Sequence, residues 1–438
     1  MEVVKKILGN RIVKNAGWLI AGKIVQMLLS LIIGILSARY LGPGNYGIIN
    51  YAAAYTTCFA SFCTLGINSV IVKNFIDHPE EEGETLGTTL LLRLISSLLS
   101  LGVIVGFVSI VDRTEPLTLV VVTLYCISLV FHIFDTFNYW FQARLLSKFY
   151  AIATLVAYVV TALYRVILLM QDRSVEWFAI ANSVDYCIVA ALLLIFYKIN
   201  GGPKLTFSIR KSKELLRVSC SYILSGLMVA VYSATDKLML KQMMSEESVG
   251  YYSLAVTIST MWTFVLSAII DSMKPSITRY YNDDKSKYVS YNKRLYAIVF
   301  YLSMAASLGI TIIAPWFVRV LYGEEFIPTV NVVRTVVWYV TFSYLGVARD
   351  TWVVCEGKQK YLKYLYISSA AINILLNAIF IPLFGALGAA GASVFTQMAN
   401  VFLIPLLIKE FRPNVYLMLR AISIKGAFGG VNNSTRVE

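Results

Sequence analysis

The stretch 86–110, LGTTLLLRLISSLLSLGVIVGFVSI, decides the fold class of this chain. A transmembrane helix needs about 20 consecutive, mostly apolar residues, and this stretch exceeds that length. It carries a single charge, Arg93. A charge at membrane depth costs roughly 2.5–3.5 kcal/mol on insertion scales, so it usually faces a protein interior or a water-filled cavity. The stretch therefore predicts a membrane helix beside an internal pocket, which favours a transporter over a membrane anchor.

Eleven further stretches share this length and apolar character. Together they predict twelve membrane spans, at residues 16–38, 46–66, 86–110, 117–140, 150–170, 175–198, 218–240, 249–272, 295–314, 327–348, 364–383 and 388–408. Charges lie well inside three of the others, at Lys23, Arg165 and Asp185. The chain is therefore predicted to be an all-α integral membrane protein.

Composition agrees with a membrane protein along the whole length. Hydrophobic residues make up 58% of the 438 residues and charged residues 14%, whereas a soluble domain carries about 25% charged residues. Mean hydropathy is +0.69. The net charge of +13 would suit a nucleic-acid partner. We predict no such partner, because the positions of the lysines and arginines are explained by membrane orientation.

The distribution of lysine and arginine predicts this orientation. With a cytoplasmic N-terminus, 28 of the 38 lysines and arginines lie in inner segments and 5 in outer loops. Cytoplasmic loops of membrane proteins carry such an excess. Both termini are therefore predicted to be cytoplasmic. The outer loops are short, which leaves little room for an enzyme site outside the membrane.

Two charged segments are predicted to be solvated in the cytoplasm. The loop 77–84, DHPEEEGE, is acidic, and no ligand is assigned to it. The segment 201–217 is basic and begins with Gly201-Gly202-Pro203. This segment divides the chain into two groups of six spans.

The two groups predict two lobes. Their limits are residues 1–200 for the first lobe, 201–217 for the linker, 218–410 for the second lobe and 411–438 for a cytoplasmic tail. The lobes repeat weakly, since 46–52 (YGIINYA) resembles 249–255 (VGYYSLA). Six spans per lobe give both lobes the same orientation, as in parallel repeats. A central cavity between two six-helix lobes is the predicted substrate path.

Polar stripes indicate which side chains line that cavity. Lys23, Gln26 and Ser30 recur at steps of three and four, so they share one helix face. Lys23 and Arg93 each lie about seven residues from the cytoplasmic end of their span, roughly 10 Å deep. At matched depth they predict a site for an anionic group such as a phosphate. Arg165 is a third candidate cation, and Asn182 a further polar lining residue.

Acidic residues in the spans have two interpretations. Asp185 lies near the middle of its span, where it can pair with a cation or carry a coupling ion, H⁺ or Na⁺. Asp236, near the outer interface, is a second candidate for ion coupling or ion pairing. The alternative is a structural ion pair without a role in transport. Serine and threonine stripes have a similar alternative, because small polar residues also serve helix packing in membranes.

Several catalytic and cofactor motifs are missing from the sequence. There is no GxxxxGK[ST] loop, HExxH or GxSxG. The chain has two histidines and six cysteines, and none forms a CxxC pair or a ligand cluster. We therefore predict no catalytic residue, no metal and no cofactor. Transport would be driven by an ion gradient or by the substrate gradient.

A set of short motifs resembles one family of transporters. The motifs cover nearly the whole chain, and their order and spacing carry the resemblance: NAGW at 15–18, ARYLGPGNYG at 38–47, WFQAR at 140–144, TDKLML at 235–240, VGYYSxA at 249–255, LYGEEF at 321–326, Asn373-x-x-x-Asn377 and IPLFGALGAA at 381–390. The chain resembles the polysaccharide biosynthesis flippases, the Wzx-type O-antigen transporters.

The resemblance implies a fold, a substrate and a location. The wider superfamily includes MATE multidrug exporters and lipid II flippases, in which two six-helix lobes form a V around a central cavity. The implied activity is alternating-access movement of undecaprenyl-diphosphate-linked oligosaccharide across the bacterial cytoplasmic membrane. Implied partners are this lipid-linked oligosaccharide, membrane lipids, a polysaccharide polymerase and a chain-length regulator.

Two other functions remain open from the sequence. A MATE-like, ion-coupled exporter of drugs or metabolites is the first alternative. A cation exporter would favour acidic cavity residues, whereas spans 1, 3 and 5 each offer a cation here. A membrane-bound polysaccharide enzyme is the second, and the short outer loops argue against it.

Overall fold

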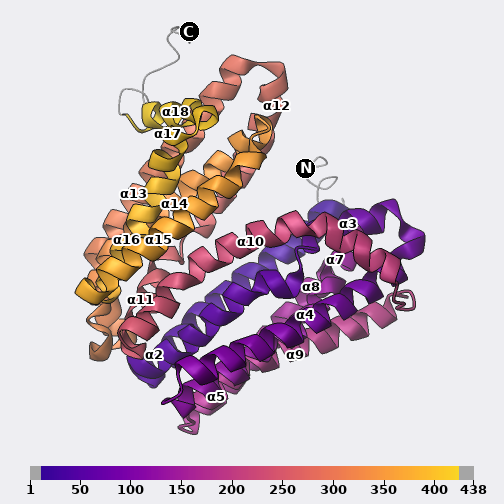
Figure 1. Ribbon diagram of the computed structural model, residues 1–438, viewed down its shortest axis with the longest axis horizontal. Coiled ribbons are helices and arrows are strands. Elements are labelled where there is room, and N and C mark those ends of the chain that lie inside the picture. Colours follow the sequence, from indigo (N-terminus) through magenta and orange to yellow (C-terminus); the bar gives the residue numbers. More distant parts are fainter. Residues whose placement is uncertain (1–10, 424–438) are drawn as a thin grey trace, which may run out of the picture. The chain divides into compact units, whose positions relative to one another are not determined.

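The computed structural model describes residues 11–423, without the side chains of residues 11–25, 28, 69, 220–225, 228, 229, 231 and 232. Every regular element in this part of the chain is a helix (Figure 1). The chain divides into two compact units, Met1–Leu238 and Met239–Glu438, and the boundary falls within a long helix. The prediction of an all-α membrane protein is confirmed. The predicted lobe limits stay a prediction.

The first unit contains the helices of the first six predicted spans. Its elements are α2 (Arg11–Thr64), α3 (Asn68–Asp77), η1 (Pro79–Glu81), α4 (Glu82–Val111), α5 (Pro116–Cys126), α6 (Ser128–Phe131), η2 (His132–Asp135), α7 (Thr136–Ala143), α8 (Lys148–Met170), α9 (Val175–Ile199) and most of α10 (Ile209–Met243). Helix α8 packs against both α2 and α9, and α5 also packs against these two helices.

Helix α2 holds two predicted spans joined by a kink. Gly42 adopts φ 70°, a left-handed conformation that glycine occupies without steric cost. Pro43 follows, and its fixed φ suits the first position of a new helical arm. The kink therefore separates the spans predicted at 16–38 and 46–66.

The second unit is built around α14. Its elements are α11 (Glu246–Thr260), α12 (Phe264–Asp283), α13 (Lys285–Tyr322), η3 (Glu324–Phe326), α14 (Thr329–Cys355), η4 (Gln359–Tyr361), α15 (Leu362–Phe384), α16 (Ala386–Met398), the π-helical turn η5 (Ala399–Leu403), α17 (Ile404–Leu407), η6 (Lys409–Phe411) and α18 (Arg412–Ile422). Helix α14 packs against α13, α16 and α11, while α15 packs against α16.

The helices agree with the twelve predicted spans. In the described residues, eight helices are long and apolar enough to cross a membrane, and the pair α11–α12, bent by 44°, makes a ninth. The other three predictions fall on the two arms of α2 and on α10, which are helical there. A twelve-helix architecture with two units is therefore consistent with the structure.

The segment between α9 and α10 is more ordered than the sequence suggests. The predicted linker 201–217 is helical from Ile209 onward. Residues 202–208, which we call the strap, cross the start of α4. The Thr206 amide donates to the Gly83 carbonyl (3.2 Å), and the Ser208 amide donates to Thr88 Oγ1 (3.0 Å).

The acidic loop is likewise not simply solvated, which corrects the expectation for 77–84. Glu82 is 5% exposed; its carboxylate accepts from Trp140 Nε1 (2.9 Å) and from Arg144 (2.6 Å). Glu81 pairs with Lys211 of α10 (2.6 Å). A buried carboxylate needs such partners, because burying an unpaired charge is costly. The acids therefore join α4, α7 and α10 at this end of the first unit.

The strap depends on glycine at position 87. A Cβ added there would lie 2.8 Å from the Thr206 nitrogen, a backbone atom that cannot rotate away. We predict that Gly87→Ala displaces the strap, because overpacking costs roughly 1–3 kcal/mol. The measurement is the rate of tryptic cleavage at the exposed Lys204, which should rise in Gly87→Ala. Gly102→Ala, on the same helix with no atom within 4 Å, is the control. Equal protection of the strap in both variants would contradict this role of Gly87.

Candidate functional site

The fourth predicted span contains a break in its helix at which polar side chains lie close together. This span, Pro116–Ala143, is interrupted by the 3₁₀ segment η2. A 3₁₀ stretch inside a longer helix often marks a functional position. His132 Nδ1 lies 3.0 Å from Asp135 Oδ2 within this segment. The His132 ring also lies against Tyr186 of α9, with 3.8 Å between the ring centroids.

Arg93 lies next to this segment, inside the first unit. It is 1% exposed. One guanidinium nitrogen donates to Thr136 Oγ1 (2.6 Å), and the other donates to Asn68 Oδ1 of α3. Asp135 is close enough to interact with Arg93 electrostatically. The guanidinium is therefore enclosed between α3, α4 and α7, and its two terminal nitrogens are engaged.

Asp185 is the second charged group of the site. Its Oδ1 accepts from Thr161 of α8 (2.9 Å). Arg165, Asp135 and His132 all interact with Asp185 electrostatically. Asp185 and Arg165 are half-buried, in contrast to Arg93. Helices α8 and α9 pack against each other, so the sequence places this pair of opposite charges at their contact.

Five residues thus form one charged cluster in the first unit: Arg93, His132, Asp135, Arg165 and Asp185. With both carboxylates ionised and His132 neutral, the two arginines balance the two acids. The sequence predicted an excess of cations, with Asp185 as a possible ion-pair partner, whereas the cluster contains as many acids as arginines. Binding an anion beside the arginines would be favoured by protonation of a carboxylate, because protonation leaves a net positive charge.

The other residues predicted to belong to the site lie outside the charged cluster. The side chain of Lys23 lies outside the described residues. On α2, Gln26 is partly exposed and Ser30 exposed; Asn182 is half-buried on α9, one turn before Asp185. Asp236 is buried on α10, beside Lys237, whose amine donates to Asn50 Oδ1 (3.3 Å). The structure thus brings Arg165 close to Asp185, and it links Arg93 to Asp185 only through Asp135. The substrate roles of all these residues stay predictions.

Sequence reasoning missed a buried arginine in the second unit. Arg349 is 2% exposed and donates to the Asn400 carbonyl (2.8 Å) and to Asn400 Oδ1 (3.1 Å). Asn400 belongs to the π-helical turn η5, and π-turns are frequent at functional sites. The predicted span ended at residue 348, but α14 continues to Cys355. The apolar run Trp352–Cys355 was the available signal that Arg349 lies inside the span.

His132 and Asp135 are residue types that can bind a metal ion. Among the residues that the structure describes, no three or more His, Cys, Asp or Glu side chains are grouped as metal ligands would be. His132 and Asp135 are therefore better described as part of a hydrogen-bonded, charged cluster than as a metal centre.

Several solved structures of other proteins share this architecture. Solved structures similar to the chain include an inward-facing MATE-family multidrug transporter (TM-score 0.67, 16% identity, 91% of this chain and 96% of the other). The inward-closed lipid II flippase MurJ is another (TM-score 0.71, 12% identity, 92% and 89%). A third is a MOP-superfamily transporter from Pyrococcus furiosus, described as having a binding pocket of reverse polarity (TM-score 0.63, 14% identity, 93% and 96%).

These structural likenesses show the fold, which the chain shares with transporters and with a lipid flippase. None of the curated proteins compared with the chain matches it. Residues 12–281 match the family described as "Polysaccharide biosynthesis protein", and this range is more than half of the chain. This protein therefore belongs to the polysaccharide biosynthesis protein family.

Proposed function

We propose that this protein is a flippase that moves undecaprenyl-diphosphate-linked oligosaccharides across the bacterial cytoplasmic membrane by alternating access. The observation that carries the proposal is the charged cluster, which lies within membrane-spanning helices of a polysaccharide biosynthesis family member. Intramembrane charges are costly and usually functional. A diphosphate headgroup needs cations at membrane depth, and the cluster supplies Arg93 and Arg165.

The two arginines contribute differently in this proposal. Arg165 is half-buried and is the cation that contacts the diphosphate directly. Arg93 is enclosed, so it acts in one of two ways. Its positive charge attracts the diphosphate from a distance, or its guanidinium gives up the hydrogen bonds to Asn68 and Thr136 and donates to phosphate oxygens instead. A unit charge about 10 Å from one phosphate charge contributes about 1.7 kcal/mol at an effective dielectric constant of about 20. Lys23, with Gln26, Ser30 and Asn182 as polar neighbours, completes the proposed substrate path.

Coupling to an ion gradient follows from the acids of the cluster. Asp185 takes up H⁺ or Na⁺ when the headgroup enters, which neutralises one of the two carboxylates that compete with the headgroup for the arginines. Asp236 is the second proposed coupling residue. A polysaccharide polymerase and a chain-length regulator would take the product, and both termini of the flippase would be cytoplasmic.

A MATE-like exporter is the second candidate function. The observation that favours it is the presence of two carboxylates in the cluster, since acids suit a cationic substrate. Deleting the gene separates the two functions. Accumulation of lipid-linked sugar units on the inner leaflet is expected for the flippase. Altered drug sensitivity without such accumulation would contradict the flippase and support the exporter.

A further inference from the structure

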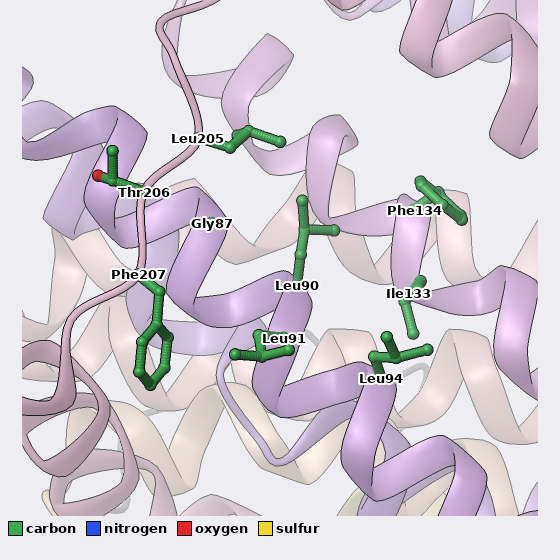
Figure 2. A pocket seen from close by; sticks show the side chains of 9 residues that line it. All are labelled: Gly87, Leu90, Leu91, Leu94, Ile133, Phe134, Leu205, Thr206 and Phe207. Carbon is green, nitrogen blue, oxygen red and sulfur yellow. The ribbon is translucent and has the colours of Figure 1, made fainter.

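An apolar pocket lies under the strap (Figure 2). Its volume is about 390 Å³. It is lined from three sides: Gly87, Leu90, Leu91 and Leu94 of α4, Ile133 and Phe134 of η2, and Leu205, Thr206 and Phe207 of the strap. Of these nine residues, Thr206 alone has a polar side chain, and its amide is bonded to Gly83. The lining therefore offers a ligand almost no hydrogen bonds.

The strap forms one wall of the pocket because its backbone amides and its apolar side chains have different contacts. The amides of Thr206 and Ser208 bond to α4, while Leu205 and Phe207 keep 43% and 52% of their surface exposed. Alternate residues of an extended segment point to opposite sides. The hydrogen bonds thus fix the segment on α4 and leave the side chains of Leu205 and Phe207 at the pocket wall, partly exposed to an occupant.

The surroundings of the pocket indicate a hydrocarbon occupant. Helix α4 is a membrane-spanning helix, and Leu91, Ile95 and Leu98 on it are exposed. The pocket is therefore continuous with a surface that meets lipid chains. Water needs two to four polar partners in a cavity, and this lining does not provide them.

The position of the pocket indicates which hydrocarbon. Leu94 follows Arg93 on α4, and Ile133 follows His132 on η2, so one pair of elements carries both the pocket and the charged cluster. We propose that the pocket binds the hydrocarbon chain of the carried lipid, next to its diphosphate. The proposal rests on the proposed function. A chain seated here would place the headgroup at the cluster within about one helical turn, 5.4 Å, along α4.

Photolabelling tests this assignment with the full-length protein in lipid nanodiscs. The probe is a polyprenyl phosphate with a diazirine on the isoprene unit nearest the phosphate. We expect labelled peptides from α4, η2 or the strap. Leu94→Trp, which fills the pocket, should reduce labelling at least fivefold. Ile95→Trp, at the neighbouring exposed position outside the lining, should label as the wild type does.

Competition and transport measurements distinguish the carried lipid from an ordinary membrane lipid as the occupant of the pocket. Unlabelled polyprenyl phosphate should abolish labelling, and phosphatidylglycerol at the same concentration should not. Equal competition by phosphatidylglycerol would overturn the assignment in favour of an ordinary membrane lipid. Equal labelling of both tryptophan variants would overturn it as well. If wild type and Leu94→Trp flip lipid-linked oligosaccharide equally, the pocket assignment fails and the proposed function stands. If the wild type flips none, the proposed function itself fails.

Discussion

Arg93→Met is expected to lower translocation of lipid-linked oligosaccharide at least about tenfold, without preventing membrane insertion. The substitution removes the donors that serve Asn68 and Thr136 inside the first unit. It also removes the positive charge that interacts with Asp135. A buried polar group left without its hydrogen-bond partner typically costs about 1–3 kcal/mol. Translocation rate and thermal unfolding temperature are the measurements, and both should fall.

Arg93→Lys separates charge from geometry. Lysine keeps the positive charge but lacks the planar fork that reaches two acceptors at once. We expect it to restore part of the translocation and less of the stability. Wild-type translocation by Arg93→Met would show that the cation is dispensable, and it would remove Arg93 from the proposed substrate site.

Asp185→Asn is expected to produce the second large effect. Asparagine can still accept from Thr161, so the helix contact survives. The residue can no longer take up a proton, and the cluster gains a net positive charge. Translocation should fall at least about tenfold, and its dependence on pH should weaken. Binding of an anionic headgroup should tighten about tenfold, because a charge removed about 10 Å away changes the energy by about 1.7 kcal/mol at a dielectric constant of about 20.

Thr161→Val is the matched control for this prediction. It removes the hydrogen bond to Asp185 and keeps the carboxylate, so a modest loss of rate with intact pH dependence is expected. The prediction would be contradicted if Asp185→Asn translocated the substrate at the wild-type rate and with the wild-type dependence on pH. Asp185 would then be a structural member of the cluster, as the alternative interpretation of the sequence holds.

Membrane helices were predictable because a bilayer sets a length and an apolar composition. The predicted spans 150–170 and 175–198 differ from α8 and α9 by only a few residues at either end. The prediction was wrong at the end of α14, where Arg349-Asp350 interrupts the hydropathy. A charged side chain whose donors are satisfied by tertiary hydrogen bonds, here with Asn400, looks like a loop residue in the sequence alone.

The site was predictable in its residue types and not in its contacts. Arg93, Arg165 and Asp185 stood out because charges are rare in apolar spans. Their grouping with His132 and Asp135 depends on how α4, η2, α8 and α9 pack, and so does the pairing of Arg93 with Asn68. The strap is a further feature that the sequence alone does not reveal. Gly83 and Gly87 look like ordinary helical glycines, and their function as a surface for backbone contact is visible only when residues 204–206 lie across them.

Reconstitution of the purified protein tests the central claim most directly. Vesicles would carry a fluorescent undecaprenyl-diphosphate oligosaccharide in both leaflets, and a membrane-impermeant reductant would be added outside. With the wild type, nearly all fluorescence should be lost in vesicles that contain protein, because lipid from the inner leaflet reaches the outside. Protein-free vesicles should keep about half. Retention of half of the fluorescence with wild-type protein, in vesicles given an ion gradient of either H⁺ or Na⁺, would contradict the assignment of this chain as a flippase for lipid-linked oligosaccharides.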